Sequence, residues 1–363
     1  YDILPYVYCC KLSTNAKSCD AYYAERPVIL YDGYIAPPLP VIAFGDPHLQ
    51  SMDKINFDFN GFGEYVAFCG KITGESVANN IQTCQPNSQQ VLKRRDTISV
   101  HYRFTKLDES HNATVTVGVA IEDPSFKKGK EALAIVTHPT RGLDVYDGSN
   151  IVRFPAETSR RKKLRKKVVF GASMWMTSNT SPDFNIRISL ASGLMLRIRE
   201  NGFGVMTVSF LRLPNTNTTQ HVGLLGIPDN DDTNDFTAAN ETVLNITSYA
   251  SVSERYEGIF YDFGQSWMVR NKTSSLFQRL VGTNEFYEYY NPTYVPSFTF
   301  VEPGEDDNCP QDICGAFTGF LFESCCYDLR VTNDTSIVRA MMTDVVKEDC
   351  LLYTSDAADD LFR

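Results

Sequence analysis

The feature that most constrains the fold of this chain is a period of two in its apolar residues. Between residue 44 and about residue 250, apolar and polar side chains alternate over short runs. Such alternation puts one face of each segment in a core and the other toward solvent, which is typical of antiparallel strands. We therefore predict an all-β fold, an antiparallel sandwich or barrel-like structure. The runs are Ile98, Val100, Tyr102 and Phe104; Val115, Val117, Val119 and Ile121; Phe184, Ile186, Ile188 and Leu190; Leu194, Leu196 and Ile198; and Val208 and Phe210.

The composition allows a sizeable core and argues against a nucleic-acid partner. Of 363 residues, 43% are hydrophobic and 21% are charged, and the formal net charge is −10. No apolar run reaches the roughly 18 residues that a spanning helix needs. Because the chain has neither an initiator Met nor a signal peptide, we interpret it as a fragment and expect a membrane anchor in a missing flank.

A labile bond is predicted at Asp46-Pro47-His48. The carboxylate of Asp46 can attack its own carbonyl carbon, and the nitrogen of Pro47 is a good leaving group once it is protonated. His48 carries a side chain suited to donate that proton in mildly acidic compartments. Self-cleavage of the Asp46–Pro47 bond is one reading, and a plain turn with a hydrogen-bonded histidine is the other.

A β-hairpin is predicted directly after this bond. Ile55, Phe57 and Phe59 alternate with polar neighbours, Asn60-Gly61 offers the positive φ angles of a tight turn, and residues 64–69 provide the returning strand.

These strings together resemble the opening of the von Willebrand factor type D domain, in which Gly-Asp-Pro-His leads into an aromatic strand and an Asn-Gly-x-Gly-Glu-Tyr turn. The preceding Cys9-Cys10 and Arg26-Pro27 resemble the end of an AMOP domain. The combination is similar to that of transmembrane mucins, sushi-domain membrane proteins and the insect junction protein Mesh. It implies a β-sandwich-like domain of this type, followed by a smaller aromatic- and Cys-rich region.

The segment Asp229 to Asp235 concentrates carboxylate and amide side chains, a costly arrangement unless a cation such as calcium shares the charge. With Gly223, Gly226 and Phe236 it resembles the acidic loop of the same domain family. The resemblance implies a Ca²⁺ site formed by Asp46, Asp229, Asn234 and Asp235, with a main-chain oxygen near Asp231. Ile227 stands where the family usually has an oxygen ligand, and a polar turn that caps strands remains the alternative.

The cysteines and glycosylation motifs favour an oxidising, extracellular compartment. Ten cysteines occur, and Leu225 replaces a cysteine that the secreted gel-forming relatives of this domain carry. Within the domain only Cys69 and Cys84 remain, and we expect them to be bonded. Seven Asn-x-Ser/Thr motifs predict glycosylation at Asn112, Asn179, Asn217, Asn240, Asn245, Asn271 and Asn333.

A basic run, Arg160 to Lys167, departs from the acidic character of the chain. It predicts a contact with a glycosaminoglycan such as heparan sulfate or with anionic lipid. A solvated loop between two strands is the simpler alternative.

The chain divides, on this reading, into four parts. Residues 1–43 are the C-terminal part of an AMOP-like domain with a Pro-rich linker, and 44–250 are the von Willebrand type D domain. Residues 251–350 form an extracellular region that follows it, and 351–363 are a non-native tail.

The predicted function is that of an extracellular, non-enzymatic module in adhesion, cell junctions or a mucin-like surface, with other cell-surface proteins as partners. No His-Glu-x-x-His, Gly-x-Ser-x-Gly or P-loop motif is present, so no enzyme class is indicated. A secreted carrier of lipid or another ligand is the alternative, since type D domains also occur in lipid-transport proteins.

Overall fold

The computed structural model describes most of the chain from residue 41 to residue 342. The described residues are 41–45, 47–73, 76–87, 96–106, 113–126, 132–138, 142–148, 150–153, 165–169, 171–178, 184–214, 221–249, 251–277, 288–296, 309–315, 317, 320–336, 338–340 and 342. The predictions for residues 1–40 and for the tail 351–363 lie outside them.

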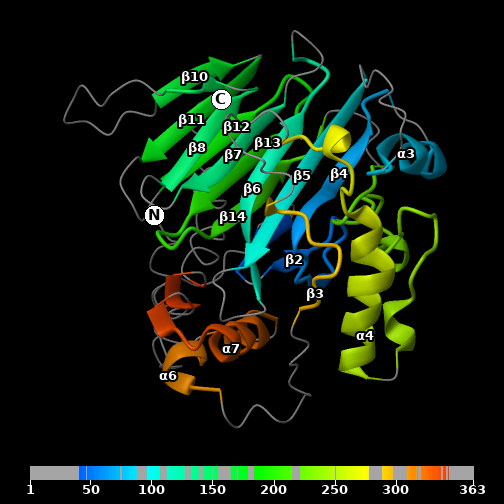
Figure 1. Ribbon diagram of the computed structural model, residues 1–363, viewed down its shortest axis with the longest axis vertical. Helices are drawn as coiled ribbons and strands as arrows, with labels where there is room; N and C mark the ends of the chain where they lie inside the picture. The colour runs from blue at the N-terminus through cyan, green and yellow to red at the C-terminus, as the bar shows by residue number, and fades with distance from the viewer. Residues whose placement is uncertain are drawn as a thin grey trace, which may run out of the picture. The chain divides into compact units, whose positions relative to one another are not determined.

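Two antiparallel sheets dominate the described residues (Figure 1). The first has the strand order β10-β11-β12-β13-β14-β1-β2-β3, and the second has the order β4-β5-β6-β7-β8-β9. The predicted all-β fold of antiparallel strands is confirmed. The strands are β1 (Val41–Phe44), β2 (His48–Gln50), β3 (Asn56–Asp58), β4 (Gly63–Lys71), β5 (Thr97–Lys106), β6 (Thr114–Glu122), β7 (Leu133–His138), β8 (Gly142–Asp147), β9 (Asn150–Ile151), β10 (Arg165–Val169), β11 (Ala172–Ser178), β12 (Phe184–Ser189), β13 (Met195–Glu200) and β14 (Met206–Arg212).

One hydrophobic core joins the two sheets. Inward-facing residues of both sheets belong to a single buried cluster, in which Phe68 of β4 and Phe210 of β14 have ring centroids 5.6 Å apart. The alternating residues named from the sequence supply much of this cluster, because each strand turns every second side chain toward the other sheet. The core therefore lies between two layers, as in a sandwich.

The predicted hairpin over residues 55–69 is wrong. β3 pairs with β2 and β4 pairs with β5, so the step at Asn60 and Gly61 crosses from one sheet to the other. Asn60 is buried, and its side-chain oxygen accepts a hydrogen bond from the N–H of Thr114 at 3.1 Å. A Cβ on Gly61 would lie 2.4 Å from the ring of Phe59. Asn60-Gly61, which favours a tight turn, is therefore a buried connection between the two sheets, packed against aromatic rings.

Residues beyond 250 continue the same compact unit, which runs from Val41 to Phe300. Helix α4 (Val252–Gly258) leads into a π-helical turn, η4 (Ile259–Phe263), and a 3₁₀ turn, η5 (Gly264–Trp267). Trp267 is fully buried and donates its indole N–H to the carbonyl of Thr237 at 3.2 Å. The boundary expected at residue 250 therefore falls inside this unit. The shorter 3₁₀ turns are η2 (Asp232–Asn234), η3 (Ile246–Ser248) and η6 (Lys272–Ser274).

A disulfide fixes helix α3 (Val77–Cys84) to β4. Cys69 and Cys84 are bonded, with Cα atoms 5.9 Å apart and a sequence separation of 15. Both cysteines are fully buried. Closing a loop of this length contributes about 3 kcal/mol in the chain-entropy model.

The C-terminal region belongs to a second compact unit and is rich in disulfides. It contains α6 (Gln311–Cys314) and α7 (Phe320–Thr332). Cys309 is bonded to Cys326, and Cys314 is bonded to Cys325, so two crosslinks tie α7 to the segment around α6. No helix among the described residues is long and apolar enough to cross a membrane.

Candidate functional site

The first candidate site is a buried chain of hydrogen bonds at the start of the unit. His48 of β2 faces Asp58 of β3 in register, and His48 Nδ1 lies 2.5 Å from Asp58 Oδ1. Asp58 Oδ2 accepts a hydrogen bond from the hydroxyl of Tyr256 on α4 at 2.6 Å. His48 is fully buried, and the ring of Phe44 packs against it with centroids 5.2 Å apart. The imidazole is therefore fixed in position from several directions.

This arrangement suits a histidine that donates a proton. Because Asp58 holds Nδ1, the other ring nitrogen, Nε2, is the one through which the imidazolium can pass a proton to another atom. Burial, followed by the negative charge of Asp58, raises the pKa of Tyr256, so the phenol stays a hydrogen-bond donor. Pro47 precedes His48, and its carbonyl accepts from the N–H of Phe59 at 3.0 Å. Asp46 lies outside the described residues.

Sequence reasoning did not identify Asp58 or Tyr256 as part of this site. Asp58 could have been predicted from the sequence, because pairing residues 48–50 with 56–58 across a short loop places it opposite His48. Tyr256 lies 198 residues further along the chain than Asp58, in a helix without a motif, so no local signal points to it.

The second candidate site is the acidic loop, where Asp235 is the buried centre. Asp235 Oδ1 accepts from the N–H of Ile227 at 3.0 Å, and Oδ2 accepts from the hydroxyl of Ser51 at 2.5 Å. The backbone joins the same two segments, since Met52 N–H donates to the carbonyl of Leu225 at 2.7 Å. The loop after β2 is thus docked on the acidic loop.

This docking brings a further carboxylate, Asp53, to the predicted ligands. Asp53 Oδ2 accepts from the N–H of Asp229 at 3.2 Å, and the amide of Asn234 donates to Asp229 Oδ2 at 2.9 Å. The other amide atom, Asn234 Oδ1, is buried and has no hydrogen-bond partner in the described part of the chain. An unpaired buried carbonyl oxygen among carboxylates is the donor type that calcium binds.

Two carboxyl groups of this cluster have raised pKa values because they are partly withdrawn from water. Burial raises the pKa of Asp235 to about 7, and the neighbouring charge of Asp53 adds to the effect. Burial, and then the charge of Asp229, also raises the pKa of Asp53. Lys54 is the cation beside Asp53, and burial lowers its pKa. A bound cation would remove the cost of ionising these carboxylates together.

The structure brings together three of the predicted ligands, Asp229, Asn234 and Asp235. The ligand predicted near Asp231 is a main-chain oxygen; the carboxylate of Asp231 is exposed and accepts from Thr233, a bond that lowers the pKa of Asp231. The carboxylate oxygens of Asp53, Asp229 and Asp235 do not all lie within 4.8 Å of one another. The cysteines that meet this distance, Cys309, Cys314 and Cys326, are disulfide-bonded and therefore not metal ligands.

The predicted glycosylation sites differ in how much the structure describes. Asn240, Asn245 and Asn333 are exposed, Asn271 is partly exposed, and Asn112, Asn179 and Asn217 lie outside the described residues. The basic run is described only from Arg165, where it forms strand β10 at the edge of the first sheet.

Comparison with known proteins relates the chain to a small group of large proteins. No family model matches the sequence. The chain is 29% identical to human Sushi domain-containing protein 2 over 339 residues, which cover 88% of this chain and 35% of that protein. It is 23% identical to protein mesh of Bombyx mori over 310 residues, 82% of this chain and 17% of that protein. Human Mucin-4 is 23% identical over 279 residues, 77% of this chain and 4% of that protein.

The chain thus spans about a third of the first relative and smaller parts of the others. The similarity extends over most of the chain in all three cases, which supports the relation to sushi-domain proteins, Mesh and mucins expected from the sequence. The type D and AMOP domains themselves stay predictions.

Proposed function

We propose that this chain is an extracellular, non-enzymatic module of a cell-surface protein that acts in adhesion, at junctions or in a mucin-like layer. The observation that carries the proposal is similarity over 88% of the chain to a sushi-domain protein and over 77% to a mucin. The buried disulfides and the exposed glycosylation motifs at Asn240 and Asn245 fit an oxidising extracellular setting. A membrane anchor in the full-length protein belongs to this proposal.

Cell aggregation tests the adhesive role. Suspension cells that express the full-length protein are expected to aggregate in calcium-containing medium, and cells that express a version lacking residues 41–300 are expected to stay dispersed. Equal surface labelling of the two versions is the control. Secretion of the protein with bound lipid, and no aggregation, would favour the carrier alternative instead.

The acidic loop is proposed to bind one Ca²⁺ that stabilises the unit. Asp46, Asp229, Asn234 and Asp235 with a main-chain oxygen near Asp231 form the proposed ligand set. We add Asp53 as a further candidate, because its carboxylate accepts from the N–H of Asp229. Hard oxygen ligands of this kind are the ones that calcium prefers. When bound, the ion would neutralise the buried carboxylate of Asp235 and its partly buried neighbours, and would link the loop after β2 to the loop after β14.

Calcium titration checks this site. Calcium at 100 times its Kd is expected to raise the free energy of unfolding by about 2.7 kcal/mol, measured by calorimetry and thermal melts. Asp229→Asn is expected to weaken binding roughly tenfold or more, since it removes a ligand charge. Asp231→Asn is the matched control, because it changes an exposed carboxylate and keeps the main-chain oxygen. Equal melting temperatures with millimolar calcium and with a chelator would reject the site.

Self-cleavage of the Asp46–Pro47 bond is proposed as the chemical property of the first site. The Asp46 carboxylate attacks its own carbonyl carbon, the C–N bond to Pro47 breaks, and the proline nitrogen takes a proton from His48. The cyclic anhydride left on Asp46 is then opened by water. His48 is held for this step by Asp58 and Tyr256, which we regard as positioning residues because neither is proposed to touch the reacting atoms.

A further inference from the structure

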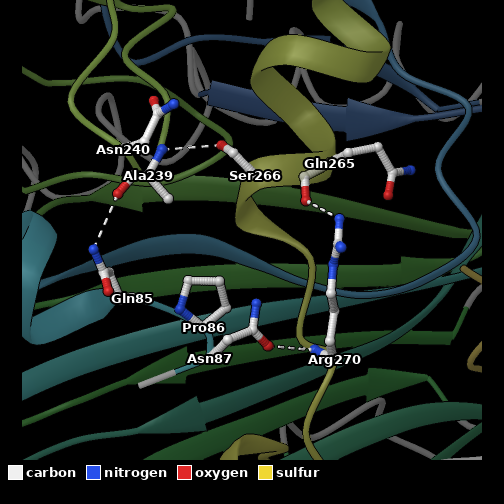
Figure 2. A pocket seen from close by; sticks show the side chains of 8 residues that line it. All are labelled: Gln85, Pro86, Asn87, Ala239, Asn240, Gln265, Ser266 and Arg270. Carbon is white, nitrogen blue, oxygen red and sulfur yellow. Dashed lines mark hydrogen bonds between the residues drawn. The ribbon is translucent and has the colours of Figure 1, made fainter. Parts of the chain in front are cut away.

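A small pocket lies beside the segment that follows α3 (Figure 2). Its volume is about 260 Å³, slightly below the usual range for ligand pockets, which suits a ligand of one sugar ring. The lining brings together segments that are more than 150 residues apart in sequence. The lining residues are Gln85, Pro86, Asn87, Ala239, Asn240, Gln265, Ser266 and Arg270.

The walls of the pocket are held by hydrogen bonds. Asn87 Oδ1 accepts from the N–H of Arg270 at 2.8 Å, and its amide nitrogen donates to the carbonyl of Met268 at 3.2 Å. The side chain of Gln85 donates to the carbonyl of Ala239 at 3.3 Å, and the N–H of Ala239 donates to Ser266 Oγ at 2.9 Å. The pocket is therefore formed in advance by the fold, which lowers the ordering cost of binding.

Arg270 is the charged residue of the lining and the group that sets the ligand class. One of its terminal nitrogens, Nη2, donates to the carbonyl of Gln265 at 3.3 Å, so the exposed side chain extends along the pocket toward Gln265 (Figure 2). No carboxylate of the described residues pairs with Arg270. A guanidinium binds a carboxylate through two parallel N–H···O bonds, and it does so better than an ammonium group.

The other walls offer both hydrogen-bonding groups and apolar surface to a ligand. Gln85 Oε1 remains available to accept a hydrogen bond, and Pro86 and Ala239 offer a small apolar surface. A polyanion such as a sulfated chain needs several cations along its length, whereas this pocket holds one. A single sugar ring that carries one carboxylate matches the volume, the charge and the mixed lining.

We propose that this pocket binds one carboxylated sugar unit of the sialic acid class, with Arg270 on the carboxylate. Two sources are available. Asn240 lines the pocket and Asn271 follows Arg270, and both begin predicted glycosylation motifs. Figure 2 shows the Asn240 side chain directed away from Arg270, so a glycan there begins at the rim and leaves the pocket open. The sugar comes either from these glycans folding back or from another molecule.

Binding of sialyllactose, with lactose as the uncharged control, tests the proposal on the full chain. Calorimetry or ligand-observed NMR is expected to detect sialyllactose with a Kd on the order of 1 mM and no binding of lactose. Arg270→Gln is expected to weaken binding roughly tenfold to a hundredfold, the worth of a hydrogen-bonded charge. Lys272→Gln, an exposed cation two residues away and outside the lining, is expected to bind like the wild type.

Variants that lack the nearby glycans distinguish the two sources. Thr242→Ala with Thr273→Ala removes both motifs and leaves Asn240 in the lining. Tighter binding of added sialyllactose in this variant, and in sialidase-treated protein, means that the chain's own glycans occupy the pocket. Unchanged binding means that the ligand comes from another molecule. Equal binding of lactose and sialyllactose, or an Arg270→Gln variant that binds sialyllactose normally, would overturn the proposal.

Discussion

At about pH 5, in the absence of any protease, the wild-type chain is expected to break between Asp46 and Pro47 into residues 1–46 and 47–363. The reason is that acid favours protonation of the leaving nitrogen of Pro47, with the imidazole of His48 as the proposed donor. Asp46→Ala removes the attacking carboxylate and is expected to abolish the reaction. Denaturing, reducing electrophoresis and N-terminal sequencing of the larger fragment measure it.

Two further variants separate the chemistry from the positioning. Asp58→Asn is expected to slow cleavage and to move the pH profile, because it removes the charge that holds His48 Nδ1 at 2.5 Å. Tyr256→Phe removes one hydrogen bond to Asp58 and is expected to have the same effect in smaller measure. Asp262→Ala, an exposed carboxylate in the π-helical turn that follows α4, is the control. An intact wild-type chain at acid pH would reject cleavage, whereas cleavage with unchanged profiles in both variants would reject only the positioning roles.

Calcium is expected to change the rate of the same cleavage reaction. Because the proposed ion would hold Asp46 as an anion away from its own carbonyl carbon, calcium is expected to slow the break and a chelator to speed it. Cleavage rates that do not respond to calcium would mean that Asp46 is not a ligand. Any calcium binding by the acidic loop would then be due to the other proposed ligands.

The strands were predictable from the sequence because their signal is local. In β5, for example, Val100 and Tyr102 are fully buried, and they alternate with residues of the other face. The step at Asn60 was not predictable, because Asn-Gly has the same local preference in a hairpin and in a crossing between sheets. The difference lies in a partner, Thr114, that is 54 residues away.

The acidic-loop site could likewise be predicted only in part from the sequence. Its composition identified Asp229, Asn234 and Asp235, and the fold adds Asp53, which sits in an ordinary turn after β2. Long-range contacts place that turn on the loop: Ser51 bonds Asp235, 184 residues away, and the N–H of Met52 donates to the carbonyl of Leu225. Motifs therefore located both candidate sites along the chain, while the residues that hold each site in place came from long-range packing.

The largest loss of stability is expected from Glu64→Ala, at about 3–5 kcal/mol. Glu64 is buried on β4, and its carboxylate accepts from His101 Nδ1 at 2.6 Å, from the hydroxyl of Ser275 at 2.5 Å and from the N–H of Leu276 at 2.9 Å. Removing the carboxylate leaves three donors without this partner. Those of His101 and Ser275 are buried, and each buried one costs about 1–3 kcal/mol. Chemical denaturation measures the change in the free energy of unfolding.

The same substitution is expected to release the segment that covers the second sheet. Beyond Leu276, Phe277 lies under the guanidinium of Arg103 at 4.0 Å and against Gly118, where an added Cβ would be 2.9 Å from its ring. Hydrogen exchange at Leu276 and Phe277 is therefore expected to quicken more in Glu64→Ala than exchange in β13, because local opening costs less than global unfolding. Glu257→Ala, an exposed glutamate on α4, is the matched control and is expected to change stability by less than about 0.5 kcal/mol. A loss of less than 1 kcal/mol in Glu64→Ala, or uniform quickening across the sheets, would show that Glu64 does not hold this segment in place.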